Sequence, residues 1–395
     1  MTRGDLPCLA LCTEYPLSDK GGVSVVVREL VEGLAGDFKV VLVSPDRPDA
    51  QDFSREFPGL KSHIPFQLGS LPPSPAYSRI AIDLASRLQS EGVGIAHFHC
   101  GGIFGWGNRW PGPSIPEHFS KRGIKTLWTN HSTELPERAF AAAGRPKWIS
   151  DSLAPVGRMG KIRQTRAVDL EIAVSAHNRR FLQEFYPAGG KTIEVVYHSR
   201  LDEDLRMPAQ VRQPRILAVG SINPRKGQDV LVQAFLQIAS RFPEWELDLV
   251  GHDGGGGCWQ EIERLKSAHP EGKRVNLLGS KDRPMELMAR TSIFVQPSRE
   301  EALGLALQEA VFAGCPSIGS AVGGIPEVLD EGKTGLLVPA DDVAALADAM
   351  ARLIPNPGLR EQMGRQGRES ILAKGMTRRG MIQSHGDLYH RLAVA

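Results

Sequence analysis

The sequence has no run of about 18 uncharged apolar residues, the length that a membrane-spanning helix requires. The apolar run from Pro7 to Cys12 is too short for the hydrophobic region of a secretory signal, so we expect no such leader. Only five cysteines occur among 395 residues, and none lies in a C-x-x-C pair. The sequence therefore predicts neither a disulfide framework nor a zinc ribbon, and it favours reduced thiols in a cytoplasmic protein. Peripheral contact with the inner face of a membrane stays open.

The chain also lacks a strong net charge. Lysine and arginine number 47 against 45 aspartate and glutamate, which leaves a formal charge of +2. No global field favours nucleic acid, so we expect no nucleic-acid partner, and an anion must be held by a local site. With 41% hydrophobic and 23% charged residues, the composition is that of an ordinary globular protein. The length predicts about two large domains.

Short apolar runs alternate with amphipathic stretches through the first half of the chain. We expect strands at Pro7 to Cys12, Phe38 to Ser44, Gly94 to His99, Ile124 to Thr129, Leu170 to Ser175 and Thr192 to Tyr197. Helical patterns lie between several of these runs, for example at residues 23–34 and 176–185. Such an alternation predicts a parallel sheet with helices on both faces.

A polar, irregular stretch at residues 198–214 predicts a linker, after which the alternation resumes. We expect strands at residues 215–220, 246–251, 274–279, 292–297, 315–319 and 335–338, and helices at residues 227–241, 304–313, 341–353 and 359–373. The sequence thus predicts an α/β protein with two Rossmann-like, doubly wound domains at residues 1–200 and 210–375. A C-terminal helix at about 376–395 is expected to pack back on the first domain. Because ligands bind outside the carboxyl ends of the strands in such sheets, we expect a site where the two sheets face each other across a cleft.

Two glycines follow the first predicted strand. In the segment D-K-G-G-V, residues 19–23, Gly21 and Gly22 open the first predicted helix. Glycine lets backbone N–H groups approach an anion closely, and a helix N-terminus adds partial positive charge. The segment therefore predicts a phosphate contact; a plain turn that needs glycine for a positive φ is the alternative.

A charged segment follows the first predicted strand of the second half. In G-S-I-N-P-R-K-G, residues 220–227, Arg225 and Lys226 lie between a strand and a helix. Arginine as a planar fork and lysine as a point charge can together neutralise a diphosphate. A solvated charged turn is the alternative, and the segment lacks the G-x-x-x-x-G-K-[ST] spacing of a P-loop.

Two glutamates flank the start of a helix in a third segment, residues 297–310. Glu301 precedes the predicted helix, and Glu309 lies eight residues later on a similar face. The N–H groups of Gly304 and Leu305, at the start of that helix, can bind phosphate oxygens. Glu309 interrupts an otherwise apolar run, so its carboxylate needs a partner, whereas a merely solvated helix is the alternative.

Taken together, these segments resemble a retaining GT-B glycosyltransferase of glycosyltransferase family 4. The resemblance is carried by the E-x7-E element from Glu301 to Glu309, the P-R-K-G turn at 224–227, the G-G-V loop at 21–23, Thr129-Asn130-His131, and G-G-I-P-E at 323–327. It covers nearly the whole chain and is strongest over residues 215–340. It implies the GT-B fold and transfer of a sugar, expected to be a hexose, from a UDP- or GDP-sugar to an acceptor hydroxyl. It requires no metal and no cofactor beyond this nucleotide-sugar substrate.

The resemblance also implies roles for the matched side chains. Glu301 is similar to the glutamate that contacts the donor sugar, and Glu309 to the one that holds the nucleotide ribose. Arg225 and Lys226 resemble the diphosphate clamp. His131 resembles the histidine near the donor sugar and the reacting bond; a hydrogen-bonded core histidine is the alternative.

Backbone groups of Gly21, Gly22, Gly304 and Leu305 would assist in binding the diphosphate. The chain departs from the family pattern at Ser221, where the family often has arginine, so Arg225 would have to supply that charge. Leu303, in place of the more usual phenylalanine, is a milder change.

Catalysis in such an enzyme would be mainly electrostatic, because the diphosphate leaves carrying charge that Arg225, Lys226 and the helix N-termini stabilise. Glu301 as a nucleophile and Glu301 as a residue that only positions the sugar both remain open. Two other classes also remain open. One is a GT-B sugar phosphorylase or nucleotide-sugar epimerase, and the other is a non-enzymatic GT-B subunit that supports an active partner.

Two further clusters in the sequence have spacings typical of other chemistry. His97 and His99 have metal-like spacing on one predicted strand, but no third ligand with such spacing is apparent, so we expect no metal there. Arg158, Lys161, Arg163 and Arg166 have near-helical spacing. They predict a solvated basic face, with an anionic acceptor or a lipid surface as the alternative.

Overall fold

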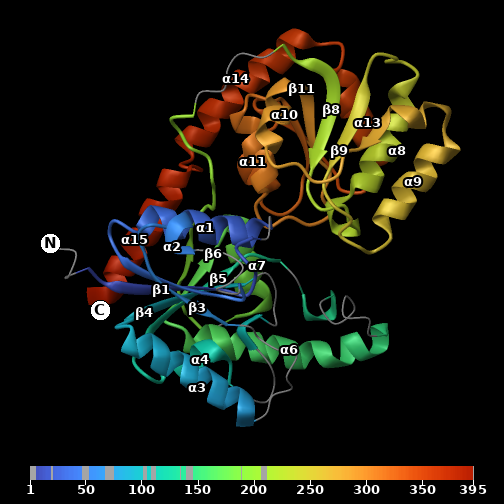
Figure 1. The fold of residues 1–395 in the computed structure, drawn as a ribbon. Coiled ribbons are helices and arrows are strands. Elements are labelled where there is room, and N and C mark those ends of the chain that lie inside the picture. The colour runs from blue at the N-terminus through green and yellow to red at the C-terminus, as the bar shows by residue number, and fades with distance from the viewer. Residues whose placement is uncertain are drawn as a thin grey trace. The chain divides into compact units, whose positions relative to one another are not determined.

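The computed structural model describes residues 6–18, 21–46, 53–66, 75–100, 105–107, 113–133, 135–138, 146–187, 189–205 and 211–394. Residues 19 and 20 of the glycine segment and residues 206–210 of the predicted linker lie outside these ranges. The chain divides into two compact units (Figure 1). Unit 1 comprises Met1–Arg200 together with Arg378–Ala395, and unit 2 comprises Leu201–Thr377.

The described part of unit 1 contains one parallel sheet of seven strands. They are β1 (Cys8–Thr13), β2 (Lys39–Ser44), β3 (Leu60–Pro65), β4 (Ile95–Cys100), β5 (Lys125–Asn130), β6 (Leu170–Ala173) and β7 (Ile193–Val195). Their order is β3-β2-β1-β4-β5-β6-β7. Successive crossovers therefore change direction between β1 and β4, which is where a doubly wound sheet binds its ligand.

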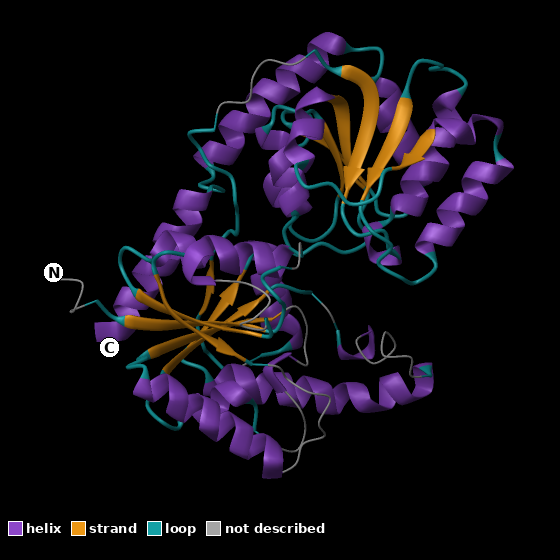
Figure 2. Ribbon diagram, viewed as in Figure 1, coloured by secondary structure: helices purple, strands orange, loops and turns teal. Residues whose placement is uncertain are grey.

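Helices cover both faces of this sheet (Figure 2). One face carries α1 (Gly22–Leu34) and α15 (Arg378–Val394), which contact each other and β4. The other face carries α3 (Pro75–Ser90), α4 (Ile115–Ser120) and α6 (Lys147–Ala167). The short α2 (Phe53–Glu56) lies against β3, and α7 (Ala176–Phe185) packs on β6 and β7.

Helix α15 is built into the core of unit 1, although it follows unit 2 in the sequence. Its Tyr389 is fully buried and meets Phe38 edge-to-face, with ring centroids 5.5 Å apart. Arg378 at its start pairs with Glu29 and Glu32 of α1. A Cβ atom on Gly33 of α1 would lie 2.1 Å from the Ile382 side chain, so glycine is needed for this close approach.

The solvated basic face predicted on α6 is wrong at Lys161, whereas Arg166 is exposed as expected. Lys161 is fully buried, pairs with Glu171 at 2.5 Å and lies over the Trp128 ring. Arg163 pairs with Glu117, and Arg158 lies 3.5 Å from Glu137. The near-helical spacing reflects partners inside unit 1, because a buried lysine is tolerated only beside a carboxylate.

The described part of unit 2 contains a parallel sheet of six strands. They are β8 (Gln213–Val219), β9 (Glu246–Val250), β10 (Val275–Leu277), β11 (Thr291–Gln296), β12 (Ser317–Ser320) and β13 (Gly335–Val338). The order β10-β9-β8-β11-β12-β13 changes direction between β8 and β11. The predicted α/β class of two Rossmann-like, doubly wound sheets is therefore confirmed.

The helices of unit 2 also form two layers (Figure 1). They are α8 (Gln228–Ala239), α9 (Cys258–Ala268), α10 (Pro284–Arg290), α11 (Leu305–Phe312), α12 (Ile325–Val328), α13 (Val343–Leu353) and α14 (Pro357–Ala373). Helix α8 packs against both α9 and α13, and α11 packs between α10 and α14. Apolar side chains from α8, α13 and the strands form one continuous core.

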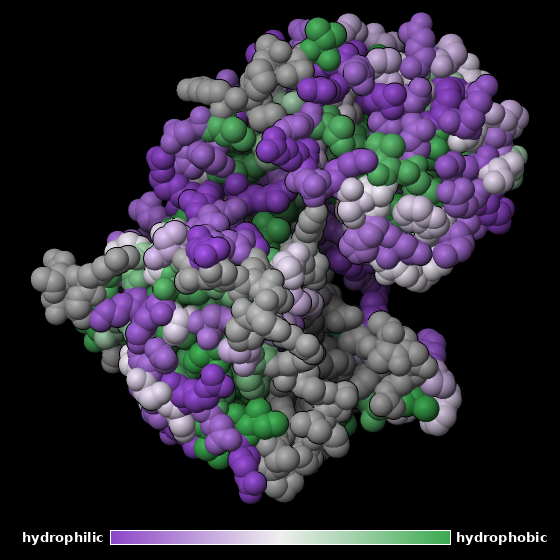
Figure 3. All heavy atoms as spheres, in the orientation of Figure 1, coloured by the Kyte–Doolittle hydropathy of each residue, from purple (hydrophilic) through white to green (hydrophobic). Residues whose placement is uncertain are grey.

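Hydrophilic residues cover most of the described surface in view, and apolar residues show in scattered patches (Figure 3). Trp148 and Met159 on α6 are among the large apolar side chains that are exposed. Among the helices described above, none combines the length with the apolar character needed to span a membrane.

Candidate functional site

The switch point of unit 2 brings two of the predicted segments together. Residues 220–227 follow β8, and residues 297–304 follow β11, the neighbouring strand across which the crossover direction changes. Both segments therefore lie at the carboxyl edge of the sheet, where parallel α/β sheets bind ligands.

The basic turn, residues 224–227, is a single 3-10 turn with local caps. The Asn223 side chain accepts a hydrogen bond from the backbone N–H of Lys226 at 3.2 Å. Gly227 then has a φ of 66°, and a Cβ atom there would lie 2.1 Å from the carbonyl oxygen of Pro297. Glycine is thus required for the left-handed conformation and for the close approach to the end of β11.

Lys226 and Glu301 form an ion pair at this edge of the sheet. The Lys226 Nζ lies 2.5 Å from Glu301 Oε2, and 17% of the lysine side chain is exposed. Gln296 Nε2 and Ser298 Oγ donate to the same carboxylate oxygen at 3.2 and 3.4 Å. The glutamate is therefore held by a cation and two neutral donors before any ligand binds.

The G-G-I-P-E segment supports the backbone of Glu301. Gly324 donates its N–H to the carbonyl oxygen of Glu301 at 3.0 Å. Gly323 has a φ of 60°, and a Cβ atom there would lie 1.7 Å from the same oxygen. This part of the predicted motif thus acts through Glu301, since only glycine permits the contact.

The N-terminus of α11 lies directly after Glu301. Gly304 caps it with a φ of 97°, no side chain caps the helix, and Leu305 is its first residue. Its unbonded N–H groups and partial positive charge suit an anion. Glu309 lies on the same helix and is 4% exposed.

In unit 1, Gly21 and Gly22 begin α1 as predicted, and both are exposed. Gly21 has a φ of −69° and makes no side-chain cap. Any residue adopts that φ, so a left-handed turn does not explain the glycine at position 21. Because both glycines are exposed and no side chain caps the helix, the N-terminus of α1 is accessible to an anion.

His131 follows β5 and belongs to a histidine cluster that also contains His97, His99, His198 and His385. Its Nε2 is 3.1 Å from Nδ1 of His99, and its ring centroid is 4.9 Å from that of His198. His385 reaches the cluster from α15, with its ring 5.4 Å from that of His198. The sequence placed His97 and His99 on one strand but did not predict the other members around them.

Burial keeps these imidazoles neutral. Desolvation lowers the pKa of His131 to about 3 and that of His385 to about 4. The pKa values of His97, His99 and His198 are also lowered by burial and by the neighbouring imidazoles. Within the described ranges, no group of three or more histidine, cysteine, aspartate or glutamate side chains is arranged to hold a metal ion.

Two hydrogen bonds hold the His97 side chain in place on β4. Its Nδ1 is hydrogen-bonded to the Tyr389 hydroxyl and its Nε2 to the Thr129 hydroxyl, both at 2.6 Å. Both nitrogens are thus engaged by the protein, which makes His97 a link between the sheet and α15.

Sequence reasoning missed three side chains that organise the site of unit 2: Gln296, Ser298 and Arg299. The only signal for them was their position, because polar residues directly after a buried strand lie at the ligand-binding edge. Arg299 is bound to the basic turn by its backbone, since its N–H donates to the Arg225 carbonyl at 2.9 Å.

Comparison with solved structures agrees with this architecture. The chain superposes on a sucrose-phosphate synthase from Thermosynechococcus elongatus with a TM-score of 0.74 at 23% identity. The superposition covers 98% of this chain and 99% of the synthase. The chain also superposes on HepE of Anabaena, solved in complex with UDP, with a TM-score of 0.76 at 13% identity. That superposition covers 97% of this chain and 100% of HepE. The fold is that of the GT-B glycosyltransferases.

Sequence comparison identifies the family. Residues 203–370 match the model for glycosyl transferases group 1, and residues 20–199 match that for glycosyltransferase family 4. The chain is 30% identical to a GDP-mannose-dependent α-(1-6)-phosphatidylinositol monomannoside mannosyltransferase of Mycobacterium tuberculosis, over 67% of this chain and 76% of the relative. The chain belongs to the group 1 glycosyltransferases of family 4, and the predicted family is confirmed.

A second relative matches over a shorter length. An N-acetyl-α-D-glucosaminyl L-malate synthase of Bacillus anthracis is 36% identical over 180 residues, which are 45% of this chain and 46% of that protein. The two relatives differ in both the sugar and the acceptor that their names state.

Proposed function

We propose that this glycosyltransferase moves a hexosyl group from a nucleoside diphosphate sugar to an acceptor hydroxyl, with retention at the anomeric carbon. The observation that carries the proposal is the Lys226–Glu301 ion pair at the switch point of unit 2, directly before the uncapped N-terminus of α11. A cation, a carboxylate and helix N–H groups there match a diphosphate joined to a sugar.

Each side chain then has a distinct task. The diphosphate binds Arg225, Lys226 and the N–H groups of Gly304 and Leu305, which stabilise its charge as it leaves. Lys226 exchanges its contact with Glu301 for the phosphate, and the carboxylate, still held by Gln296 and Ser298, accepts hydrogen bonds from the sugar hydroxyls.

Glu309 is proposed to hold the ribose, from its burial on α11 and its place in the E-x7-E element. The parts of Gly21, Gly22 and His131 in the reaction rest on the family resemblance alone.

The donor is proposed to carry UDP or GDP. A relative is named for GDP-mannose, and a protein of the same fold was solved with UDP. Calorimetric titration with UDP, GDP and ADP tests this: we expect heat and a raised melting temperature with at least one of them, because a ligand of the native state stabilises it by mass action. No binding of any of the three would contradict the proposal.

Retention is supported by the resemblance to retaining enzymes. An α-linked donor should give an α-linked product, which proton NMR of the anomeric signal of the product tests once an acceptor is in hand. A β-linked product from an α donor would overturn the retaining mechanism and the role given to Glu301.

Leaving-group stabilisation by protein cations is proposed to replace a metal. Arg225 and Lys226 supply positive charge at the basic turn, and the Asp202-Glu203-Asp204 run lies outside the site, before β8. Turnover is expected to survive EDTA. Loss of turnover that Mg²⁺ or Mn²⁺ specifically restores would contradict this.

A further inference from the structure

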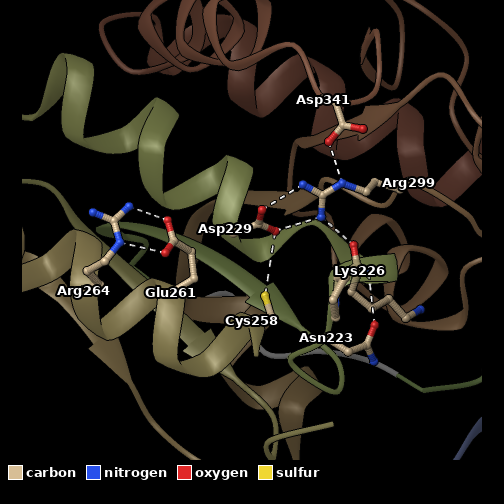
Figure 4. Close-up of polar contacts among 9 residues, drawn as sticks. Asn223, Lys226, Asp229, Cys258, Glu261, Arg264, Arg299 and Asp341 are labelled. Carbon is tan, nitrogen blue, oxygen red and sulfur yellow. Dashed lines mark hydrogen bonds and ion pairs between the residues drawn. The ribbon is translucent and has the colours of Figure 1, made fainter. Parts of the chain in front are cut away.

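Arg299 joins the basic turn to two other segments of unit 2. Its Nη1 donates to the carbonyl oxygen of Pro224 at 2.5 Å, and Nη1 and Nη2 donate to the two carboxylate oxygens of Asp229 at 2.9 and 2.7 Å. Its Nε donates to Asp341 at 2.5 Å. Figure 4 shows the guanidinium lying between the carboxylates of Asp229, on α8, and Asp341.

The Arg299 guanidinium is bound by two carboxylates and a backbone carbonyl of the protein. The bidentate pair with Asp229 uses the planar fork of the guanidinium, a geometry that lysine cannot reproduce. Hydrogen bonding to the Asp229 side chain raises the pKa of Arg299, which keeps it charged. Asp229 is only 17% exposed and also lies 3.8 Å from the Cys258 thiol, whose pKa burial raises to about 11. The thiol is therefore neutral, and Arg299 supplies the charge that balances the partly buried Asp229 carboxylate.

The segment Arg299–Glu301 holds the basic turn at three successive points. The Arg299 side chain binds the Pro224 carbonyl, the Arg299 N–H binds the Arg225 carbonyl, and the Glu301 carboxylate binds Lys226. The first two contacts leave the side chains of Arg225 and Lys226 uninvolved. They fix the backbone from which both cations project. The Asn223 cap and the Glu300 N–H, which donates to the Arg225 carbonyl at 3.4 Å, add further support to the turn.

We infer that Arg299 is a positioning residue for the donor diphosphate: by tying the Pro224 carbonyl to Asp229, it fixes the basic turn so that Arg225 and Lys226 meet the phosphates together. The inference rests on the proposed function and names a residue outside the motifs that carry the family resemblance. Arg299 does not contact the ligand. Its effect on binding passes through the turn.

The test uses the full chain and the affinity for UDP and GDP, measured by calorimetry well below the melting temperature of each variant. Arg299→Gln is expected to weaken binding of the preferred nucleotide at least tenfold, about 1.4 kcal/mol, and to raise the KM of the donor sugar. Arg299→Lys keeps the charge but loses the fork, so we expect it to remain several-fold weaker than the unaltered protein. Asp229→Asn should also weaken binding, because it releases the guanidinium without touching the turn.

Two control variants separate this role from general stabilisation. Arg264→Gln removes a bidentate arginine–glutamate pair, Arg264 with Glu261 on α9, that has no contact with the turn (Figure 4). Asp341→Asn perturbs the contact with Nε, on a side chain that is 58% exposed. Both are expected to bind nucleotide within twofold of the unaltered protein.

A double-mutant cycle distinguishes positioning from direct phosphate binding. If Arg299 acts through the turn, Arg299→Gln should change the affinity little when Arg225 and Lys226 are already alanine, because no cations are left to position. If Arg299 touched the phosphates itself, the losses would add, and the inference would be wrong.

Nucleotide affinity of Arg299→Gln and Arg299→Lys equal to that of the unaltered protein would also overturn the inference, while leaving the proposed function intact. Failure of the unaltered protein to bind any nucleotide would overturn both. If Arg299→Gln does not fold, Arg299→Lys and Asp229→Asn decide the matter by the same measurements.

Discussion

Lys226 neutralises a carboxylate that is nearly buried, so its removal affects the fold as well as the chemistry. Among the described residues, Lys226→Met leaves Glu301 with Gln296 and Ser298 as side-chain donors. We expect a loss of about 1 to 3 kcal/mol in the free energy of unfolding and a fall in turnover on the order of a hundredfold. Urea denaturation and steady-state rates measure the two effects.

The same measurement in a Glu301→Gln background is the control. A neutral amide needs no cation, so Lys226→Met should cost less stability there. Equal costs in the two backgrounds would mean that the ion pair contributes nothing to folding.

Gly323 offers a second test at the residue scale. Gly323→Ala forces a side chain into a φ of 60° and against the carbonyl of Glu301. Gly332→Ala has a similar φ of 70° but no atom within 4 Å of the new Cβ, so it measures the conformational cost alone. That cost is about 1 to 2 kcal/mol.

We expect Gly323→Ala to unfold at clearly lower urea than Gly332→Ala and to bind nucleotide sugar more weakly. Indistinguishable unfolding curves and affinities for the two variants would show that the contact with Glu301 is unimportant.

Residue types that carry charge at strand ends were predictable, but their partners were not. The positions of Arg225, Lys226 and Glu301 after two apolar runs pointed to one edge of a sheet. The pairing of Lys226 with Glu301, and of Arg299 with Asp229, joins residues about 70 or more positions apart in sequence. No local pattern encodes such a distance, so the notion that Lys226 is merely a solvated turn residue could be corrected only by the structure.

At the scale of elements, buried strands were easier to predict than exposed ones. Strands such as β2 and β4 are apolar runs because helices cover both faces. Strand β3 was missed because it is the edge strand, paired with β2 alone, and its sequence L-K-S-H-I-P is largely half-exposed. Helix α6 was recognised only as basic spacing, since its buried face contains Lys161, Gln164 and glycines rather than an apolar stripe.

The histidine cluster makes unit 1 sensitive to acid. Folding lowers the pKa of these imidazoles below the value of about 6.5 for an exposed histidine, to about 3 for His131 and about 4 for His385. Below pH 6.5 the unfolded chain therefore binds protons that the folded unit excludes. Stability falls as the pH drops from about 6.5 towards 4, by up to about 1.4 kcal/mol per pH unit for each histidine.

Hydrogen exchange of β4 and β5 peptides at a series of pH values, corrected for the intrinsic rate, should show this loss, with β9 of unit 2 as the internal reference. His198→Asn should reduce the slope by about one proton. A β4 protection that stays constant between pH 7 and 5 would contradict the prediction.

At the scale of the whole molecule, unit 2 is inserted into unit 1. The sequence of unit 1 stops at Arg200 and resumes at Arg378, and the resumed segment is the single helix α15. The contacts of Tyr389 with His97 and Phe38, and of Ile382 with Gly33, mean that this helix completes a core whose other parts lie more than 170 residues earlier.

On the ribosome, the half of the protein that is made first is therefore finished last. The sheet of unit 1 emerges with this face of β4 covered only in part, by α1, and with His97 lacking its Tyr389 partner. Unit 2 must be synthesised before the covering helix appears. Nascent chains stalled after unit 2 has emerged but before α15 should resist protease in unit 2 and be cut in unit 1. Release of α15 should then protect both, so a chaperone that shields apolar sheet surface would be needed longest by the N-terminal half.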